Sequence, residues 1–224
     1  MPSTAIQPIP DAPGHLQVTL LGGFAVSVNG AEIPADRWSA LRATHLVQLL
    51  SLQPRHRAAR DLVIDALWPQ LDPDAGAANL RKAMHHARQA LGRHDSMAQQ
   101  AGELVLWPQG PITVDADEFE QRADAALRLR DPAACAEAAH AYAGVVLPGA
   151  RFEAWTEPVR ERLHARYLEL LRASAQWAIL AQQEPTDEGA HRALMQQALD
   201  AGNRAAALHW YARLRESLQQ ALGV

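Results

Sequence analysis

The stretch at residues 72–92, DPDAGAANLRKAMHHARQALG, constrains the fold more than any other part of the sequence. Its apolar side chains recur at intervals of four, three and four residues, which places them on one stripe of an α-helix. They are Leu80, Met84, Ala87 and Leu91. Asp72 and Asp74 suit the positive end of a helix dipole, and Gly92 is a typical stop signal. The sequence therefore predicts a helix with one apolar side that packs on a small domain.

The opposite face of this predicted helix carries amides, cations and imidazoles. Its residues are Asn79, Arg81, Lys82, His85, His86, Arg88 and Gln89. A surface helix normally mixes both signs of charge, yet no carboxylate lies between Asn79 and Gly92. This face indicates an anionic partner, with a solvated helix face as the alternative interpretation.

The composition is that of a globular protein with one large or two modest domains: 224 residues, 48% of them hydrophobic. Cys135 is the single cysteine, which excludes an internal disulfide and a thiolate-rich zinc site. Residues 1–14 are rich in proline and lack both periodicity and the features of a secretion signal, so we expect a disordered leader. No apolar run reaches membrane-spanning length, and the sequence predicts a cytoplasmic protein without membrane contact.

The formal net charge of −4 is unevenly distributed along the chain. Residues 1–110 hold nine basic and nine acidic side chains, whereas residues 111–224 hold twelve basic and sixteen acidic ones. The first half is therefore the better candidate for nucleic-acid binding, although its balance is not strongly basic.

Residues 15–110 have the pattern of a small α+β domain. Alternating apolar residues predict strands around Val18 and Val26, and Asn29-Gly30 favours a tight hairpin turn into a short strand near Glu32-Ile33. A helical pattern follows from Trp38 to Leu52. Its expected core positions are Leu46, Leu49 and Leu50.

A short connector leads into a second predicted helix, Asp61 to Trp68. The connector supplies three further cations, Arg55, Arg57 and Arg60, and the helix is expected to turn Leu62, Ala66 and Leu67 inward. A phosphate clamp and a solvated connector are equally good interpretations of these cations. A hairpin is predicted from Met97–Gln100 and Glu103–Trp107, with Trp107 as a candidate for exposure. This order is the layout of a winged helix-turn-helix, in which the third helix enters the major groove.

Four segments of the sequence resemble one family of bacterial regulators. They are LQVTLLGGFAVSVNG, DLVIDALWP, AANLRKAMHHARQALG and ITVDADEF. Together they are similar to the Streptomyces antibiotic regulatory proteins (SARPs), which join a winged helix of the response-regulator type to a bacterial transcriptional activator domain. The resemblance implies sequence-specific binding of double-stranded DNA, often by paired molecules that form a homodimer on repeated sites, and recruitment of RNA polymerase. It also implies base or phosphate contacts for Asn79 and Arg81, followed by Lys82, His85, His86 and Arg88.

Residues 111–224 are rich in alanine and predicted to be almost entirely helical. Ala138 and Tyr142, and then Ala207 and Tyr211, repeat a small residue followed four later by an aromatic one, and Gly202 matches a turn. This spacing is typical of tetratricopeptide-like hairpins, in which the aromatic ring fills the space above the small residue. A long helix is expected around Trp155 to Gln182. Near residues 183–185, where SARPs usually carry a further helix pair, the resemblance implies either that this member has lost the pair or that the printed sequence omits it.

Other kinds of chemistry have little support in the sequence. His85, His86 and His94 lack the spacing of metal ligands, and Cys135 lies among alanines as a packing residue would. Since no phosphate-binding glycine loop or nucleophile motif is present, we expect no enzyme activity and no cofactor. The sequence therefore predicts a transcriptional activator of two domains, 15–110 and 111–224. A protein-interaction scaffold whose winged helix no longer binds DNA is the alternative.

Overall fold

The structure, a computed structural model, describes residues 14–223. Residues 1–13, the bulk of the predicted leader, lie outside the described residues. The chain divides into two units. The first unit holds the chain up to Asp115 together with Leu147–Thr156, and the second holds Ala116–Val146 and the chain from Glu157 onward.

The first unit contains a sheet in the order β3-β2-β1-β7. Strand β1 (Leu16–Thr19) pairs antiparallel with β2 (Ala25–Val28), which pairs antiparallel with β3 (Ala31–Glu32). Strand β7 (Ile112–Val114) lies parallel to β1. In the loop between β2 and β3, Asn29 has a φ of 52° and Gly30 a φ of 80°. These angles confirm the tight turn that the sequence predicts.

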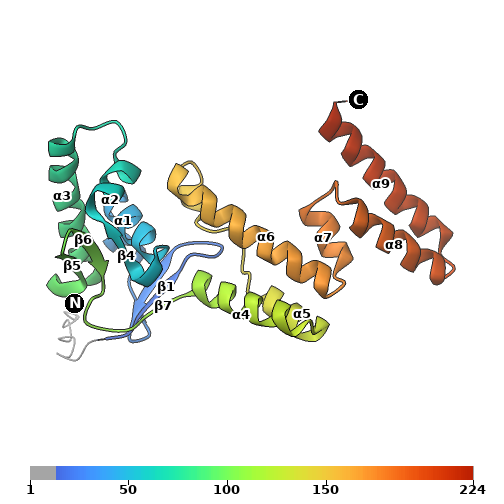
Figure 1. The fold of residues 1–224 in the computed structure, drawn as a ribbon, viewed down its shortest axis with the longest axis horizontal. Coiled ribbons are helices and arrows are strands. Elements are labelled where there is room, and N and C mark those ends of the chain that lie inside the picture. Colours follow the sequence, from blue (N-terminus) through green and yellow to red (C-terminus); the bar gives the residue numbers. More distant parts are fainter. Residues whose placement is uncertain (1–13, 224) are drawn as a thin grey trace, which may run out of the picture. The chain divides into compact units, whose positions relative to one another are not determined.

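Three helices and a second sheet complete the first unit (Figure 1). The helices are α1 (Leu41–Ser51), α2 (Arg60–Leu67) and α3 (Pro73–Leu91), which pack on one another. The sheet has the order β4-β6-β5, formed by β4 (Arg57–Ala59), β5 (Met97–Gln100) and β6 (Glu103–Leu106). All seven predicted core positions of α1 and α3 are buried, which confirms the apolar stripes: Leu46, Leu49, Leu50, Leu80, Met84, Ala87 and Leu91.

Two predictions about single side chains in this unit are wrong. Leu62 is 49% exposed, because α2 turns its Val63, Ile64 and Leu67 inward, and Leu62 lies on the other side of the helix. Trp107 is buried, since its indole Nε1–H donates to the carbonyl oxygen of Gly14 at 2.6 Å. Gly14, the last residue of the predicted leader, is therefore held against the first unit.

Gly76 sits where α3 crosses α2, and a methyl group there would overlap Cγ2 of Ile64. We expect Gly76→Ala to lower the free energy of unfolding by roughly 1–2 kcal/mol, because overpacking of about 1–3 kcal/mol outweighs the better helix propensity of alanine. Urea denaturation measures this loss. Gly23→Ala is the control, since nothing lies within 4 Å of the added atom and the change is expected to be neutral. Equal stability of the two variants would show that α2 and α3 do not pack closely here.

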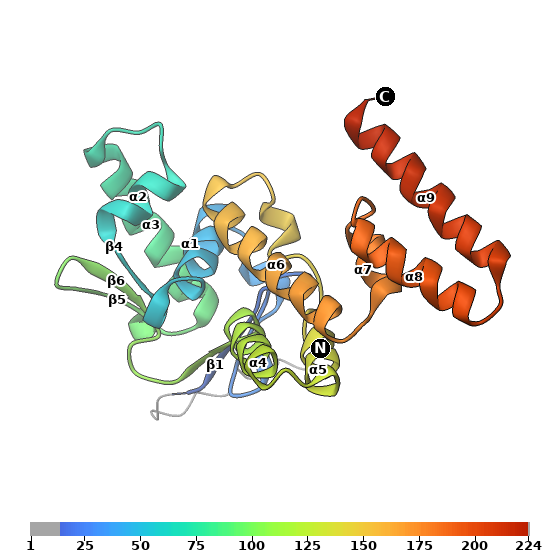
Figure 2. The ribbon, with the colours of Figure 1, turned by 45° about the vertical axis from the view of Figure 1, so that its right-hand side comes forward.

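The second unit consists of helices (Figure 2). They are α4 (Asp115–Leu129), α5 (Pro132–His140), α6 (Glu157–Ala173), α7 (Trp177–Gln183), α8 (Glu188–Asp200) and α9 (Arg204–Leu222). Successive helices from α5 onward pack on one another. Gly202, with a φ of 71°, lies in the turn between α8 and α9, as predicted. In residues 14–223, no helix combines the length and apolar composition that a membrane crossing requires.

The predicted long helix around Trp155 to Gln182 is in fact two helices. Helix α6 ends because Ala175 adopts a left-handed φ of 55° and the N–H of Gln176 donates to the carbonyl oxygen of Leu171 at 2.9 Å. This is the hydrogen-bond pattern that commonly ends a helix with glycine, formed here by alanine.

The two predicted pairs of a small and an aromatic residue also differ in the structure. Tyr142 follows α5 and stacks on Tyr167 with ring centroids 4.5 Å apart, which agrees with a space-filling role. Ala207 is buried, but Tyr211 is 54% exposed. Trp210 lies on the packed side instead, with its ring edge-on to His191 at 5.9 Å.

His191 is buried at the beginning of α8, and neither of its ring nitrogens has a hydrogen-bond partner among the described residues. Burial lowers the pKa of His191 and Arg213 lowers it further, whereas Asp187 raises it. A folded state with a lowered histidine pKa binds fewer protons than the unfolded state does. The free energy of unfolding therefore has its full value above the unfolded-state histidine pKa of about 6.5, and it decreases as the pH falls below that value.

We expect His191→Leu to stabilise the second unit by about 1 kcal/mol at pH 8, because it removes two unpaired buried nitrogens. The gain is expected to grow at pH 5, where the parent loses stability and the variant does not. Thermal unfolding at both pH values measures the effect, with His209→Leu, an exposed position on α9, as the control. A variant less stable than the parent at pH 5 would contradict this account of His191.

Candidate nucleic-acid interface

Helix α3 has a well-defined cap at each end. Asp72 Oδ1 accepts hydrogen bonds from the backbone N–H groups of Asp74 and Ala75, at 3.0 and 2.9 Å. Gly92 closes the helix in the left-handed conformation, with a φ of 73°. Both ends agree with the helix that the sequence predicts, and the helical period places most of its polar side chains on one outer face.

The outer face of α3 offers cations and hydrogen-bond donors to solvent. Arg81, Lys82, His85, His86 and Gln89 are exposed, and Asn79 is half-buried. Neither Arg81 nor Lys82 has an ion-pair partner among the residues that the structure describes. The rings of His85 and His86 lie 5.6 Å apart, edge to face. We call this set, from Asn79 to Gln89 without Arg88, the outer face of α3.

Arg88 has a different position from its neighbours. Its Nε and Nη2 donate to the carbonyl oxygen of Met97 at 3.1 and 2.7 Å, so the guanidinium ties α3 to the beginning of β5. At the same end of α3, Arg37 Nη2 donates to the carbonyl oxygen of Gln89 at 2.7 Å. The structure therefore commits Arg88, a predicted contact residue, to holding the hairpin beside the helix.

The three arginines of the predicted connector do not form one cluster of free cations. Arg55 is exposed in a short turn and adopts a left-handed φ of 56°. Arg57 lies in β4 and not in a loop, and its Nη1 is 3.6 Å from Oε2 of Glu103. Arg60 begins α2, and its Nη1 is 3.0 Å from Oδ1 of Asp61. Neighbouring carboxylates thus offset two of the three charges.

The hairpin of β5 and β6 has the expected strands but a tip without cations. Its exposed tip residues are Gln99, Gln100, Ala101 and Gly102. The N–H of Arg60 donates to the carbonyl oxygen of Gly102 at 3.0 Å, which fixes the tip beside the beginning of α2. The amides of Gln99 and Gln100 are further candidate contacts. The sequence did not indicate a binding role for them, because the alternating pattern there predicts only a strand.

Two comparisons with known proteins address the family. Residues 114–224 match the family described as bacterial transcriptional activator domain. A structure of Mycobacterium tuberculosis EmbR in complex with a low affinity phosphopeptide is similar with a TM-score of 0.69 and 19% sequence identity. Residues 114–224 of this chain are therefore a bacterial transcriptional activator domain. No curated protein sequence matches the chain.

The EmbR comparison covers 94% of this chain and 62% of the EmbR chain. The chain thus spans less than two thirds of the structure that it resembles. The likeness confirms the predicted fold class, a winged helix-turn-helix followed by tetratricopeptide-like helices. The family is one of transcriptional regulators and not a class of enzymes.

Proposed function

We propose that this chain is a SARP-type transcriptional activator and that it binds double-stranded DNA sequence-specifically through the outer face of α3. The observation that carries the proposal is the outer face itself, whose exposed cations and amides have no carboxylate among them. Arginine can donate two hydrogen bonds to a guanine edge, and asparagine can pair in the same way with adenine. Arg81 and Asn79 are the residues proposed for base contacts, and Lys82, His85 and His86 for base edges or phosphates.

The hairpin and the connector supply proposed contacts outside the major groove. Gln99 and Gln100 at the hairpin tip can donate to phosphate or sugar oxygens, and Arg55 is exposed for the same purpose. Arg57 and Arg60 need only exchange a surface carboxylate for a phosphate, which costs little because exposed ion pairs are weak. In this proposal Arg88 acts indirectly, by holding β5 beside α3.

We further propose that the helical second unit contacts RNA polymerase and that two copies of the chain occupy repeated sites. Both proposals derive from the SARP resemblance. The tetratricopeptide-like arrangement supports the first, since stacked helical hairpins offer extended surfaces for protein contacts.

A protein-interaction scaffold is the second candidate function. Its support is that the first 110 residues have balanced charge, that Arg88 is used internally, and that carboxylates accompany Arg57 and Arg60. In that case the outer face of α3 would be a solvated surface or a docking site for an acidic protein.

Selection from a pool of random duplexes, at two salt concentrations, separates the two functions. DNA binding predicts an enriched motif, often a direct repeat, whose affinity falls with salt in proportion to the phosphates contacted. The Arg81→Ala variant is expected to lose that enrichment. If no motif emerges and the variant behaves like the parent, DNA binding is wrong and the scaffold becomes the better account.

A further inference from the structure

The segment Leu147–Thr156 connects the two units in an unexpected way. By sequence it lies inside the bacterial transcriptional activator domain, which matches residues 114–224. In the structure it belongs to the first unit, the one that carries α3. We call Leu147–Thr156 the return segment, because the chain enters the second unit at Ala116 and comes back to the first unit here.

The return segment is anchored in the first unit by backbone and side-chain contacts. The N–H of Leu147 donates to the carbonyl oxygen of Leu20 at 2.8 Å, and the side chains of Leu147, Ala150 and Thr156 are buried. Two consecutive turns follow, in which Glu153 N–H donates to Ala150 O and Thr156 N–H donates to Glu153 O, both at 3.0 Å. The Thr156 hydroxyl also donates to Glu153 O at 2.8 Å. These bonds hold the backbone of Glu153 in one place.

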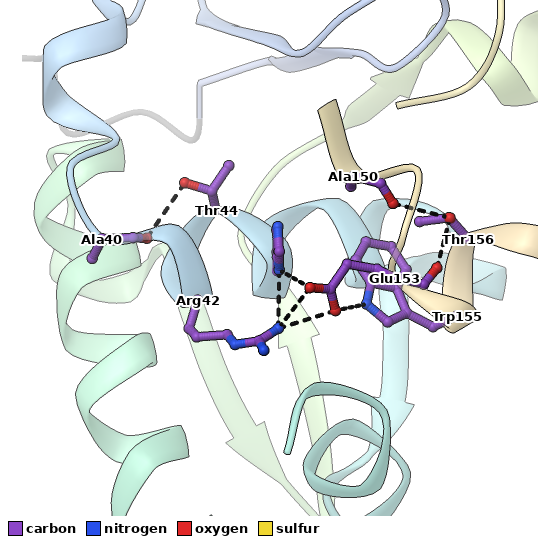
Figure 3. A network of polar contacts seen from close by, with 8 residues as sticks. Ala40, Arg42, Thr44, Ala150, Glu153, Trp155 and Thr156 are labelled. Carbon is purple, nitrogen blue, oxygen red and sulfur yellow. Dashed lines mark hydrogen bonds and ion pairs between the residues drawn. The ribbon is translucent and has the colours of Figure 1, made fainter. Parts of the chain in front are cut away.

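The carboxylate of Glu153 meets the first turns of α1 (Figure 3). Arg42 Nη1 donates to its two oxygens at 3.1 and 3.0 Å. Trp155 Nε1 donates to Oε2 at 3.2 Å, and His45 Nδ1 lies 3.5 Å from Oε1. One carboxylate thus joins two residues of α1 and one of the return segment.

His45 shows why a negative charge is needed at this point. Arg42 Nη1 lies 3.2 Å from His45 Nδ1, so the Glu153 carboxylate faces a guanidinium and a buried imidazole that lie side by side. Burial lowers the pKa of His45, Glu153 raises it, and Arg42 lowers it. Without Glu153, the buried imidazole would face the guanidinium with no compensating charge.

Helix α1 also lacks the usual stabilisation of its own N-terminus. Its N-cap residue is Ala40, which forms no side-chain cap, and its first turn contains no acidic residue. The Glu153 carboxylate supplies the missing negative charge beside that turn, where the helix dipole favours it. Since α1 packs directly on α3, any loosening of α1 reaches the helix that carries the outer face.

We propose that Glu153 is a positioning residue for DNA recognition: through Arg42 and His45 it fixes α1, and through α1 it fixes α3. The DNA part of this inference rests on the proposed function. The structural part, that a residue within the activator-domain sequence orders the winged helix, can be tested in the free protein.

The first test is amide hydrogen exchange in the full chain without DNA. Glu153→Gln keeps the side-chain volume and removes the charge. We expect amide exchange in α1 to become roughly three- to tenfold faster in this variant. The factor is modest because Arg42 and Glu153 are partly exposed. Glu153→Asp, which keeps the charge, is expected to restore part of the protection. The control is Glu120→Gln, which breaks the Glu120–Arg162 pair of the second unit at similar exposure and is expected to leave α1 unchanged.

The second test is discrimination between the selected duplex and an unrelated one. We expect Glu153→Gln to lower the ratio of the two affinities by about three- to tenfold, the factor expected for α1 exchange. The Arg42→Gln/Glu153→Gln double variant is expected to lose no more than the more affected single variant, because both residues act through one contact. Unchanged α1 exchange in Glu153→Gln would overturn the positioning role, whatever the DNA result. Faster exchange with an unchanged affinity ratio would overturn its link to recognition. Failure of the parent to select any motif would contradict the proposed function instead, and the exchange result would still decide the role of the return segment.

Discussion

Arg81→Ala is expected to weaken binding to the selected DNA site by roughly fivefold to 150-fold, since one good bidentate base contact contributes about 1–3 kcal/mol of discrimination. Arg81 is exposed on α3 and has no ion-pair partner among the described residues, so its removal should leave the fold intact. Binding to the parent site and to single-base variants of that site measures the effect. The loss is expected to concentrate at one base pair, where the variant no longer prefers the parent base.

Arg215→Ala provides the matched control for charge. Arg215 is exposed on α9 in the second unit, and its removal changes the net charge by the same amount. We expect its affinity for the site to stay within twofold of the parent, an effect of the size typical of remote surface changes. Equal losses for the two variants would mean that net charge alone, and not a contact from α3, governs binding.

Leu80→Ala, one residue before Arg81, is expected to have the largest effect on stability. The Leu80 side chain is 2% exposed in the core of the first unit, where truncation of a leucine typically costs about 2–5 kcal/mol. Urea unfolding measures the loss. It is monitored through the hydrogen exchange of α1, so that the first unit is observed separately. Gln89→Ala, an exposed change on the same helix, is the control and should alter stability by less than about 0.5 kcal/mol. A Leu80→Ala variant as stable as this control would contradict the assignment of the two faces of α3.

Helix α3 could be predicted closely from the sequence because local signals determine it. The acidic residues at its start, its stop at Gly92 and its apolar stripe all act within a few residues. The structure confirms the start, the stop and the stripe, and it adds that Asp72 is the N-cap. The break after α6 could not be predicted in this way. Ala175 ends the helix in a left-handed conformation that sequence rules assign to glycine, so no glycine or proline marked the position.

The division into units depends on contacts that local patterns do not carry. The predicted boundary at residues 110 and 111 did not anticipate that Leu147–Thr156 belongs to the first unit, because the hydrogen bond from Leu147 to Leu20 joins residues far apart in sequence. The burial of Trp107 has the same origin, since its partner is the carbonyl oxygen of Gly14. Both contacts exist only once the chain has folded.

The candidate interface was predictable in outline but not in the use of each arginine. The periodicity of α3 placed its outer residues correctly, since exposure follows from the position of the apolar stripe. The tie from Arg88 to Met97 and the pair of Arg57 with Glu103 arise from the packing of the hairpin against α3 and β4. Residue type alone does not separate an arginine that holds a hairpin from one that is free to contact DNA.

Directed cleavage of DNA from α3 tests the central claim most directly. Cys135 is the single cysteine and is buried, and burial raises the pKa of its thiol, so a cysteine introduced at exposed Gln89 can carry an iron chelate selectively. We predict that the Gln89→Cys conjugate cuts within the selected site and that a Gln99→Cys conjugate, on the hairpin, cuts the flanking segment. A Gln89→Cys conjugate that binds the site with the affinity of the parent and leaves the site uncut would contradict the account.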